Sequence, residues 1–104
     1  MIMANFNILD YTPSNTESIK TFDDLKFEAN VYSDKRAYLD FGNGYSVSVI
    51  DDFIGGLHGI ELYEVAIFKD DDFAREYGES GVIQHLNRND VTNIMAYLQH
   101  KAAE

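Results

Sequence analysis

The chain has 104 residues, with 18 acidic against 8 basic side chains and no cysteine, which gives a formal net charge of −10. This length suits one domain, and a hydrophobic content of 45% is enough for a packed core. The charge disfavours direct binding to nucleic acid or anionic membranes, because both repel an acidic protein. Without cysteine, disulfides and thiolate chemistry are excluded. No long apolar run or signal-like start is present, so we expect a cytoplasmic protein.

Residues 1–20 differ from the rest of the chain and are interpreted as an N-terminal extension. They contain a turn cluster at 13–16. Before this cluster, Phe6 and Ile8 alternate with asparagines. Regular alternation begins afterwards. Apolar residues at every second position from Leu25 to Val31 predict a first half-buried strand, and residues 33–35 then turn the chain.

The clearest local signal is a hairpin over residues 36–50. Cross-strand partners must share a face, which decides the length of its loop. A three-residue loop, Gly42-Asn43-Gly44, pairs Leu39 with Val47 on the apolar face, whereas a two-residue loop would pair apolar residues with polar ones. The longer loop therefore predicts the remaining partners. They are Phe41 with Tyr45, Ala37 with Val49, Asp40 with Ser46, and Tyr38 with Ser48.

A glycine-containing loop over 51–59 follows, and it has neither the spacing nor the charge of a phosphate-binding loop. Residues 61–69 predict another strand, with Tyr63, Val65 and Ile67 on one face. An acidic turn at 70–72 leads to a weaker strand over 73–77. Residues 82–86 are interpreted as the lead into a helix.

The helix is predicted from a stripe of apolar residues at 3.6-residue spacing: Val91, Ile94, Met95 and Leu98. Asn87 is suited to cap its start, with Asp90 three residues later. Together these elements predict an α+β fold, an antiparallel β-meander of four to five strands packed on one C-terminal α-helix. The predicted organisation is an N-terminal extension, 1–20, and a single α+β domain, 21–104.

Residues 21–28, 41–49 (Phe-Gly-Asn-Gly-Tyr-Ser-Val-Ser-Val), 62–67, 82–86 and 90–92 resemble a group of short proteins of tailed bacteriophages and prophages. The matching motifs are a hairpin turn, a strand and a helix cap, so the resemblance concerns the fold. It implies a phage origin and work inside an infected bacterium. It implies no particular reaction.

Nothing in the sequence predicts catalysis, a cofactor or a metal site. There is no nucleophile elbow, and the three histidines, His58, His85 and His100, lack the spacing of paired metal ligands. The acidic run at 70–72 lacks the spaced acids, the mid-loop glycine and the closing glutamate of an EF-hand. We therefore expect a binding protein rather than an enzyme, with an unrecognised acid-based activity as a remote alternative.

The first predicted binding surface is an acidic end of the sheet. In an up-and-down meander, the acids before the first strand and those after the fourth strand fall at the same end. The predicted contacts are Asp23, Asp24, Asp70, Asp71 and Asp72. Strands about 4.8 Å apart would spread them over roughly 15 Å, comparable with a few phosphates of a duplex. The specific hypothesis is a counter-defence inhibitor that mimics nucleic acid and binds a nucleic-acid-binding enzyme. The competing interpretation is that these acids only keep solvated loops soluble.

The second predicted surface is the open sheet face, turned away from the helix. Its predicted contacts are Tyr38, Asp40, Leu62, Glu64 and Phe68. Aromatic groups among scattered charges are typical of protein contact sites. The expected partner is a host or phage protein. The alternative is a second copy of the chain in a homodimer, which would make the protein a self-associating structural or assembly factor. If Phe6, Ile8 and Leu9 cover this face, it belongs to the core instead.

Overall fold

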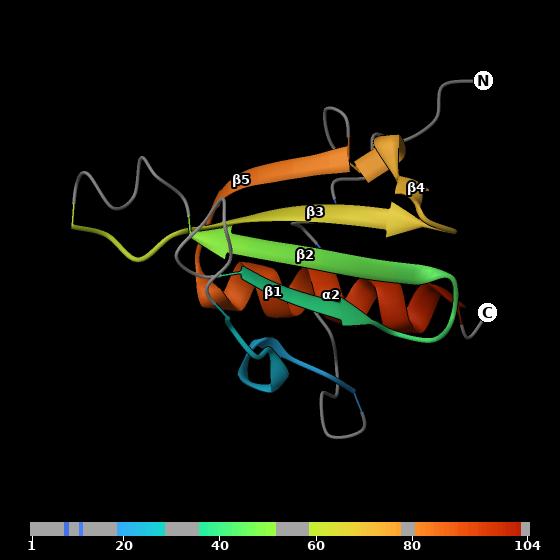
Figure 1. Ribbon diagram of the computed structural model, residues 1–104, viewed down its shortest axis with the longest axis horizontal. Helices are drawn as coiled ribbons and strands as arrows, with labels where there is room; N and C mark the ends of the chain where they lie inside the picture. Colours follow the sequence, from blue (N-terminus) through green and yellow to red (C-terminus); the bar gives the residue numbers. More distant parts are fainter. Residues whose placement is uncertain are drawn as a thin grey trace.

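The computed structural model describes residues 8, 11, 19–28, 36–51, 59–77 and 81–102. In this part of the chain five strands form one antiparallel sheet, and one α-helix, α2 (Arg88–Ala102), packs against it (Figure 1). The strands are β1 (Arg36–Asp40), β2 (Tyr45–Asp51), β3 (Tyr63–Lys69), β4 (Asp72–Phe73) and β5 (Val82–Leu86). β1 to β4 form a meander, and β5 pairs with β3. The predicted α+β class is confirmed.

The β1–β2 hairpin has the predicted register. Leu39 pairs with Val47, and Phe41 N–H donates to the Tyr45 carbonyl oxygen at 3.0 Å. The three-residue loop closes because Gly42 and Gly44 have φ of +76° and +97°, which side chains disfavour. Asn43 ties the loop to the helix, since its Oδ1 accepts Tyr45 N–H and its Nδ2 donates to the Leu98 carbonyl oxygen.

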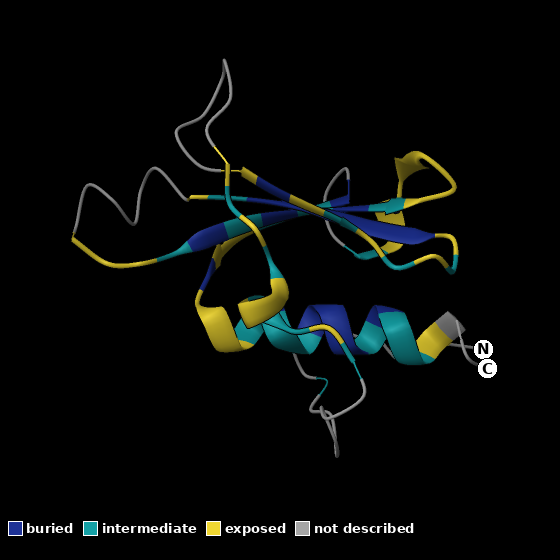
Figure 2. Ribbon diagram, turned by 60° about the horizontal axis from the view of Figure 1, so that its bottom comes forward, coloured by how far each residue is buried: buried dark blue, intermediate teal, exposed yellow. Residues whose placement is uncertain are grey.

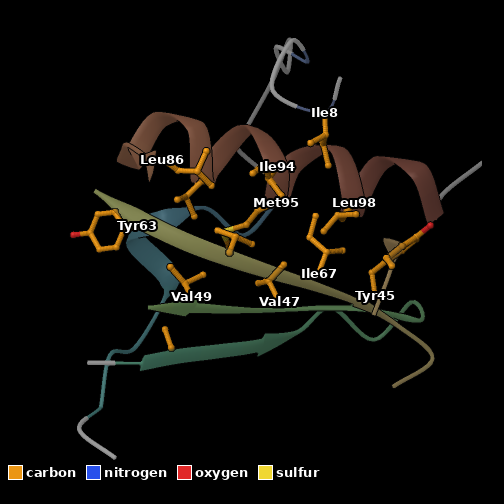
Figure 3. Packing of buried hydrophobic residues seen from close by; sticks show 14 residues of the cluster. Ile8, Tyr45, Val47, Val49, Tyr63, Ile67, Leu86, Ile94, Met95 and Leu98 are labelled. Carbon is orange, nitrogen blue, oxygen red and sulfur yellow. The ribbon is translucent and has the colours of Figure 1, made fainter. Parts of the chain in front are cut away.

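The core lies between one face of the sheet and α2. Val47 and Val49 of β2 and Ile67 of β3 are fully buried, and Figure 3 shows them pointing toward the helix. The predicted helical stripe is buried against them, each of its four residues being 0% exposed. These residues are Val91, Ile94, Met95 and Leu98. Within the described ranges, no helix is long and apolar enough to cross a membrane.

Helix α2 begins with the predicted cap. Asp90 N–H donates to Asn87 Oδ1 at 2.8 Å, and Asn87 N–H donates to Asp90 Oδ2 at 3.1 Å. This reciprocal pair satisfies two groups that have no partner inside the helix. Leu86, directly before the cap, is 1% exposed and joins Val91 in the core. The cap therefore links the last strand to the helix without a loop.

The predicted strand over 25–31 does not form in its described part. Residues 22–24 make a 3₁₀ turn, η2 (Phe22–Asp24), and the only sheet-like contact of residues 19–28 is a single bridge between Glu28 and Arg36. The alternation nevertheless tracks burial, because Leu25 and Phe27 are half-buried while their neighbours are exposed. These side chains pack on the core without a strand ladder. Residues 29–35, including the predicted turn at 33–35, lie outside the described residues.

The prediction for residues 73–86 also needs correction. Instead of one weak strand over 73–77, β4 ends at Phe73 and a 3₁₀ turn, η3 (Arg75–Tyr77), follows. Residues 82–86, predicted as a lead into the helix, form β5. A bulge places two residues, Gln84 and His85, opposite one residue of β3, and His85 has φ of +63°. The extra residue breaks the two-residue alternation that would have marked this strand.

The described residues of the N-terminal extension lie against α2. Ile8 is 2% exposed within the core (Figure 3), and the Tyr11 ring contacts Tyr97 edge-on at 5.4 Å. The Lys20 backbone exchanges two hydrogen bonds with the Gln99 side chain. Phe6 and Leu9, and the loop residues 52–58, lie outside the described residues.

Candidate protein-binding surface

The outer sheet face is the side of the sheet turned away from α2 (Figure 2). Antiparallel partners share a face, so the strand registers arrange its residues in rows across the sheet. The row nearest the β1–β2 turn contains Asp40, Ser46, Phe68 and Phe73; the second contains Tyr38, Ser48, Ala66 and Val82; the third contains Arg36, Ile50 and Glu64. The predicted contacts Tyr38, Asp40, Glu64 and Phe68 thus share this face. The fifth, Leu62, directly precedes β3 and is half-buried.

Aromatic side chains form the exposed apolar part of this face. Tyr38 is 55% exposed and Phe73 is 42% exposed. The Phe73 ring packs beside Phe68, with ring centroids 4.8 Å apart and planes tilted by 40°. Phe73 was not among the predicted contacts. Reading residues 70–71 as a two-residue hairpin turn would have placed it opposite Phe68 and revealed it.

The charged side chains of the third row are hydrogen-bonded to neutral side chains of the protein. Arg36 Nε donates to Ser48 Oγ at 2.8 Å, and Gln84 Nε2 donates to Glu64 Oε1 at 2.7 Å. Glu64, a predicted partner contact, therefore already has a hydrogen-bond donor. The carboxylates of Asp40, Asp70 and Asp71, which form no ion pair with a described basic side chain, lie toward the other end of the face, near the first row.

We call Asp40, Asp70, Asp71 and Asp72 the acidic turn end. Asp70 and Asp71 form the two-residue turn between β3 and β4, with φ of +52° and +69°. Asp70 N–H donates to the Gly44 carbonyl oxygen at 2.8 Å, which fixes this turn beside the β1–β2 loop. Among the described residues, the one ion pair at this end is a long contact of 3.9 Å between the carboxylate of Asp72 and the guanidinium of Arg75. The acidic turn end therefore keeps most of its negative charge.

A hollow of about 260 Å³ opens at the acidic turn end. It is lined by Asp40, Gly42, Gly44, Ser46, Asp70 and Asp71. Lys69, next to Asp70 in the chain, points to the opposite side of the sheet, where its Nζ lies 5.5 Å from the centre of the Tyr45 ring. The hollow thus joins residues from both predicted surfaces and contains no lysine or arginine among its described lining residues.

The structure separates Asp23 and Asp24 from the other predicted acids. The neighbouring Phe22 ring lies 5.0 Å from the ring of Tyr63, the first residue of β3, whereas Asp70 follows the last residue of that strand. Seven residues at about 3.3 Å each put these ends roughly 20 Å apart. The prediction that all five acids share one end is therefore wrong. It depended on a strand over 25–31, and Asp24 instead accepts the Thr21 N–H within the η2 turn.

A second hollow, of about 370 Å³, lies at this other end and was not predicted. Arg88 makes a two-pronged ion pair with Glu61, both bonds being 2.8 Å, and its guanidinium lies 5.2 Å from the centre of the Phe22 ring. This pairing raises the pKa of Arg88, and burial together with the Glu61 hydrogen bond raises the pKa of Tyr63. Glu61 and Arg88 are 27 positions apart, so no local motif could reveal the pair. Since Arg88 is already paired with Glu61, we interpret this site as a structural contact that holds residues 21–28 against the sheet and α2.

The described residues contain no group of three or more histidine or acidic side chains placed to hold a metal ion. At the acidic turn end, Asp40, Asp70 and Asp71 form no ion pair with a described basic side chain, and Tyr38 and Phe73 are exposed on the adjoining face. No protein-family model, no curated protein and no solved structure matches this chain.

Proposed function

We propose that this protein is a small acidic accessory factor that acts by binding the basic surface of another protein. The binding surface consists of the acidic turn end and the adjoining aromatic residues of the outer sheet face, Tyr38, Phe68 and Phe73. One observation carries the proposal: Asp40, Asp70 and Asp71 pair with no described basic side chain and lie beside exposed aromatic rings. Aromatic anchors next to unneutralised charge are typical of protein contact sites.

The class of partner follows from charge. A net charge of −10 repels nucleic acid itself and attracts proteins whose surfaces bind nucleic acid. Combined with the resemblance to short phage proteins, this favours inhibition of a nucleic-acid-binding enzyme in the cytoplasm of an infected bacterium. The acids that take part are those of the acidic turn end; Asp23 and Asp24 are left out because they lie at the other end of β3.

The test is affinity capture of partners from bacterial lysate, at low and high salt, with charge-matched variants. Asp70→Asn/Asp71→Asn removes two charges from the acidic turn end, and asparagine tolerates the positive φ of both positions. Asp23→Asn/Asp51→Asn removes two exposed charges from the other end of β3. We expect the first variant alone to lose the captured partner, and salt to weaken capture by the wild type. Equal losses in both variants, or capture indifferent to salt, would contradict the proposal.

Self-association through the outer sheet face is the second candidate, favoured by the exposure of Tyr38 and Phe73. Two identical acidic surfaces repel each other, so salt would strengthen a homodimer, whereas it weakens binding to a basic partner. Sedimentation velocity at several protein concentrations, in low and high salt, separates the two functions. A dimer that grows with salt and disappears in Tyr38→Ser would favour an assembly role.

A further inference from the structure

We infer that the hollow at the acidic turn end is a pocket for one arginine side chain of the partner protein. The inference rests on the proposed function and adds to it the identity of the recognised group. The lining combines acceptors from three separate parts of the sheet, namely β1 with Asp40, β2 with Ser46, and the β3–β4 turn with Asp70 and Asp71.

Ser46 forms the floor of this pocket. It is only 6% exposed, and its cross-strand partners on either side are Asp40 and Phe68. No described residue makes a hydrogen bond to its hydroxyl, although every fully enclosed side-chain polar atom in the described part of the chain has a partner. The Ser46 hydroxyl must therefore be reached from the hollow. A nearly buried hydroxyl without a protein partner is costly unless water or a ligand satisfies it, so Ser46 offers an acceptor to a donor that enters the hollow.

The walls are carboxylates held in place by the two turns. Asp40 Oδ1 accepts the Gly42 N–H at 2.8 Å, which leaves its other oxygen free. The carboxylate of Asp70 lies against Gly44, where an added Cβ would come within 3.3 Å of Asp70 Oδ1. The absence of a side chain at Gly44 therefore gives this carboxylate its room. The two turns together hold the acceptors around an opening rather than at one point.

The acceptors that line the hollow suit a guanidinium better than a metal ion. A metal needs several ligands within about 2.0–2.6 Å of one point, and the described acids offer no such group of three. A guanidinium is planar and spreads five N–H donors around its edge, so it can use acceptors that are set apart. A lysine ammonium concentrates its three donors on one atom and fits these separated acceptors less well.

Two contacts elsewhere in the protein show how the bound group would be held. In the next row of the outer sheet face, Arg36 Nε donates to the hydroxyl of Ser48 at 2.8 Å, the same pairing that Ser46 would offer. At the other end of the sheet, the Arg88 guanidinium lies over the Phe22 ring. Phe68, beside Ser46, and its neighbour Phe73 offer an arginine a similar aromatic surface.

The test is an NMR titration of the whole protein with N-acetyl-arginine amide, followed through backbone amide shifts. We expect saturable shifts at Gly42, Gly44, Ser46 and Asp71. The matching citrulline compound, which has the same shape but no charge, should give none, and the lysine compound should bind more weakly. Ser46→Ala, which removes a hydroxyl acceptor, and Asp71→Asn, which removes a negative charge facing the guanidinium, should each weaken arginine binding roughly tenfold or more. Asp23→Asn, at the other end of β3, is the control and should leave binding unchanged.

The inference is overturned if citrulline shifts the same amides as strongly as arginine, or if neither Ser46→Ala nor Asp71→Asn weakens binding. It is equally overturned if calcium chloride shifts them and arginine does not. The proposed function is tested separately by partner capture. Loss of capture in Asp70→Asn/Asp71→Asn, together with no arginine binding by the wild type, would retain the proposed function and reject the pocket. Arginine binding by the wild type, together with partner capture that does not depend on the two charges, would retain the pocket and reject the proposed function.

Discussion

Replacing Asn87 by alanine should destabilise the protein by removing one half of the cap that begins α2. The bond from Asp90 N–H to Asn87 Oδ1, at 2.8 Å, is lost, whereas the bond from the backbone N–H of residue 87 to Asp90 Oδ2 uses no side-chain atom of residue 87 and survives. Loss of an N-cap side chain costs about 1 kcal/mol, within a range of about 0.5–2 kcal/mol. For a domain of this size, 1 kcal/mol lowers Tm by about 4–8 °C.

Asn89→Ala is the matched control, because the same chemical change two residues later should not destabilise the protein. Asn89 is exposed in the first turn of α2, and no hydrogen bond of its side chain occurs among the described residues. Alanine is the better helix former, so stability should stay the same or rise by up to about 0.5 kcal/mol. Urea denaturation followed by far-ultraviolet circular dichroism measures both variants. Equal midpoints for the two variants, or a change of slope in Asn87→Ala alone, would refute this reasoning.

Two further predictions concern a close backbone approach and the alkaline limit of stability. Gly81→Ala should lower the free energy of unfolding more than Gly42→Ala, although both have φ of +76°, because an added Cβ at Gly81 would lie 3.1 Å from the Ala74 nitrogen and one at Gly42 would meet nothing within 4 Å. The left-handed backbone alone costs about 1–2 kcal/mol, so thermal melts that show equal losses would exclude the steric contribution. Burial raises the pKa of Tyr63 and, together with hydrogen bonds from neighbouring tyrosines, that of Tyr77 above the ordinary value of 10.0. The folded state thus favours the neutral phenols. Ionisation of these tyrosines therefore leaves the free energy of unfolding unchanged below about pH 10 and lowers it as pH rises further. Urea midpoints across that range should fall less steeply in Tyr77→Phe; an unchanged fall would contradict the assignment.

The hairpin and the helix were predictable because their signals are local and redundant. In the β1–β2 hairpin, a shift of one residue would have placed Leu39 opposite Ser48, so the apolar pattern allowed one register. In α2, the apolar stripe and the cap at Asn87 specify the same start and the same buried face. Where two independent patterns agree over a short segment, tertiary contacts have little left to decide.

The acidic layout and two of the elements depended on contacts that local patterns do not contain. Residues 25–27 alternate as a strand does, but their burial comes from packing on the core, and Phe22 N–H bonds to Thr92 in the helix instead of to a neighbouring strand. Because this segment is not a strand of the meander, Asp23 and Asp24 lie at the opposite end of β3 from Asp70. The bulge at His85 concealed β5 in the same way, because an inserted residue shifts the alternation by one position.

The position of α2 in the chain order has a consequence during synthesis. All five strands precede the helix, so the ribosome makes the apolar side of the sheet, with Val47, Val49 and Ile67, before it makes the element that shields that side from water. Until then the nascent polypeptide exposes apolar side chains of the kind that drive aggregation. Mutual repulsion between chains carrying many carboxylates opposes such association. Part of the acidic character can therefore serve the unfinished polypeptide, by keeping chains apart until α2 covers the apolar side of the sheet.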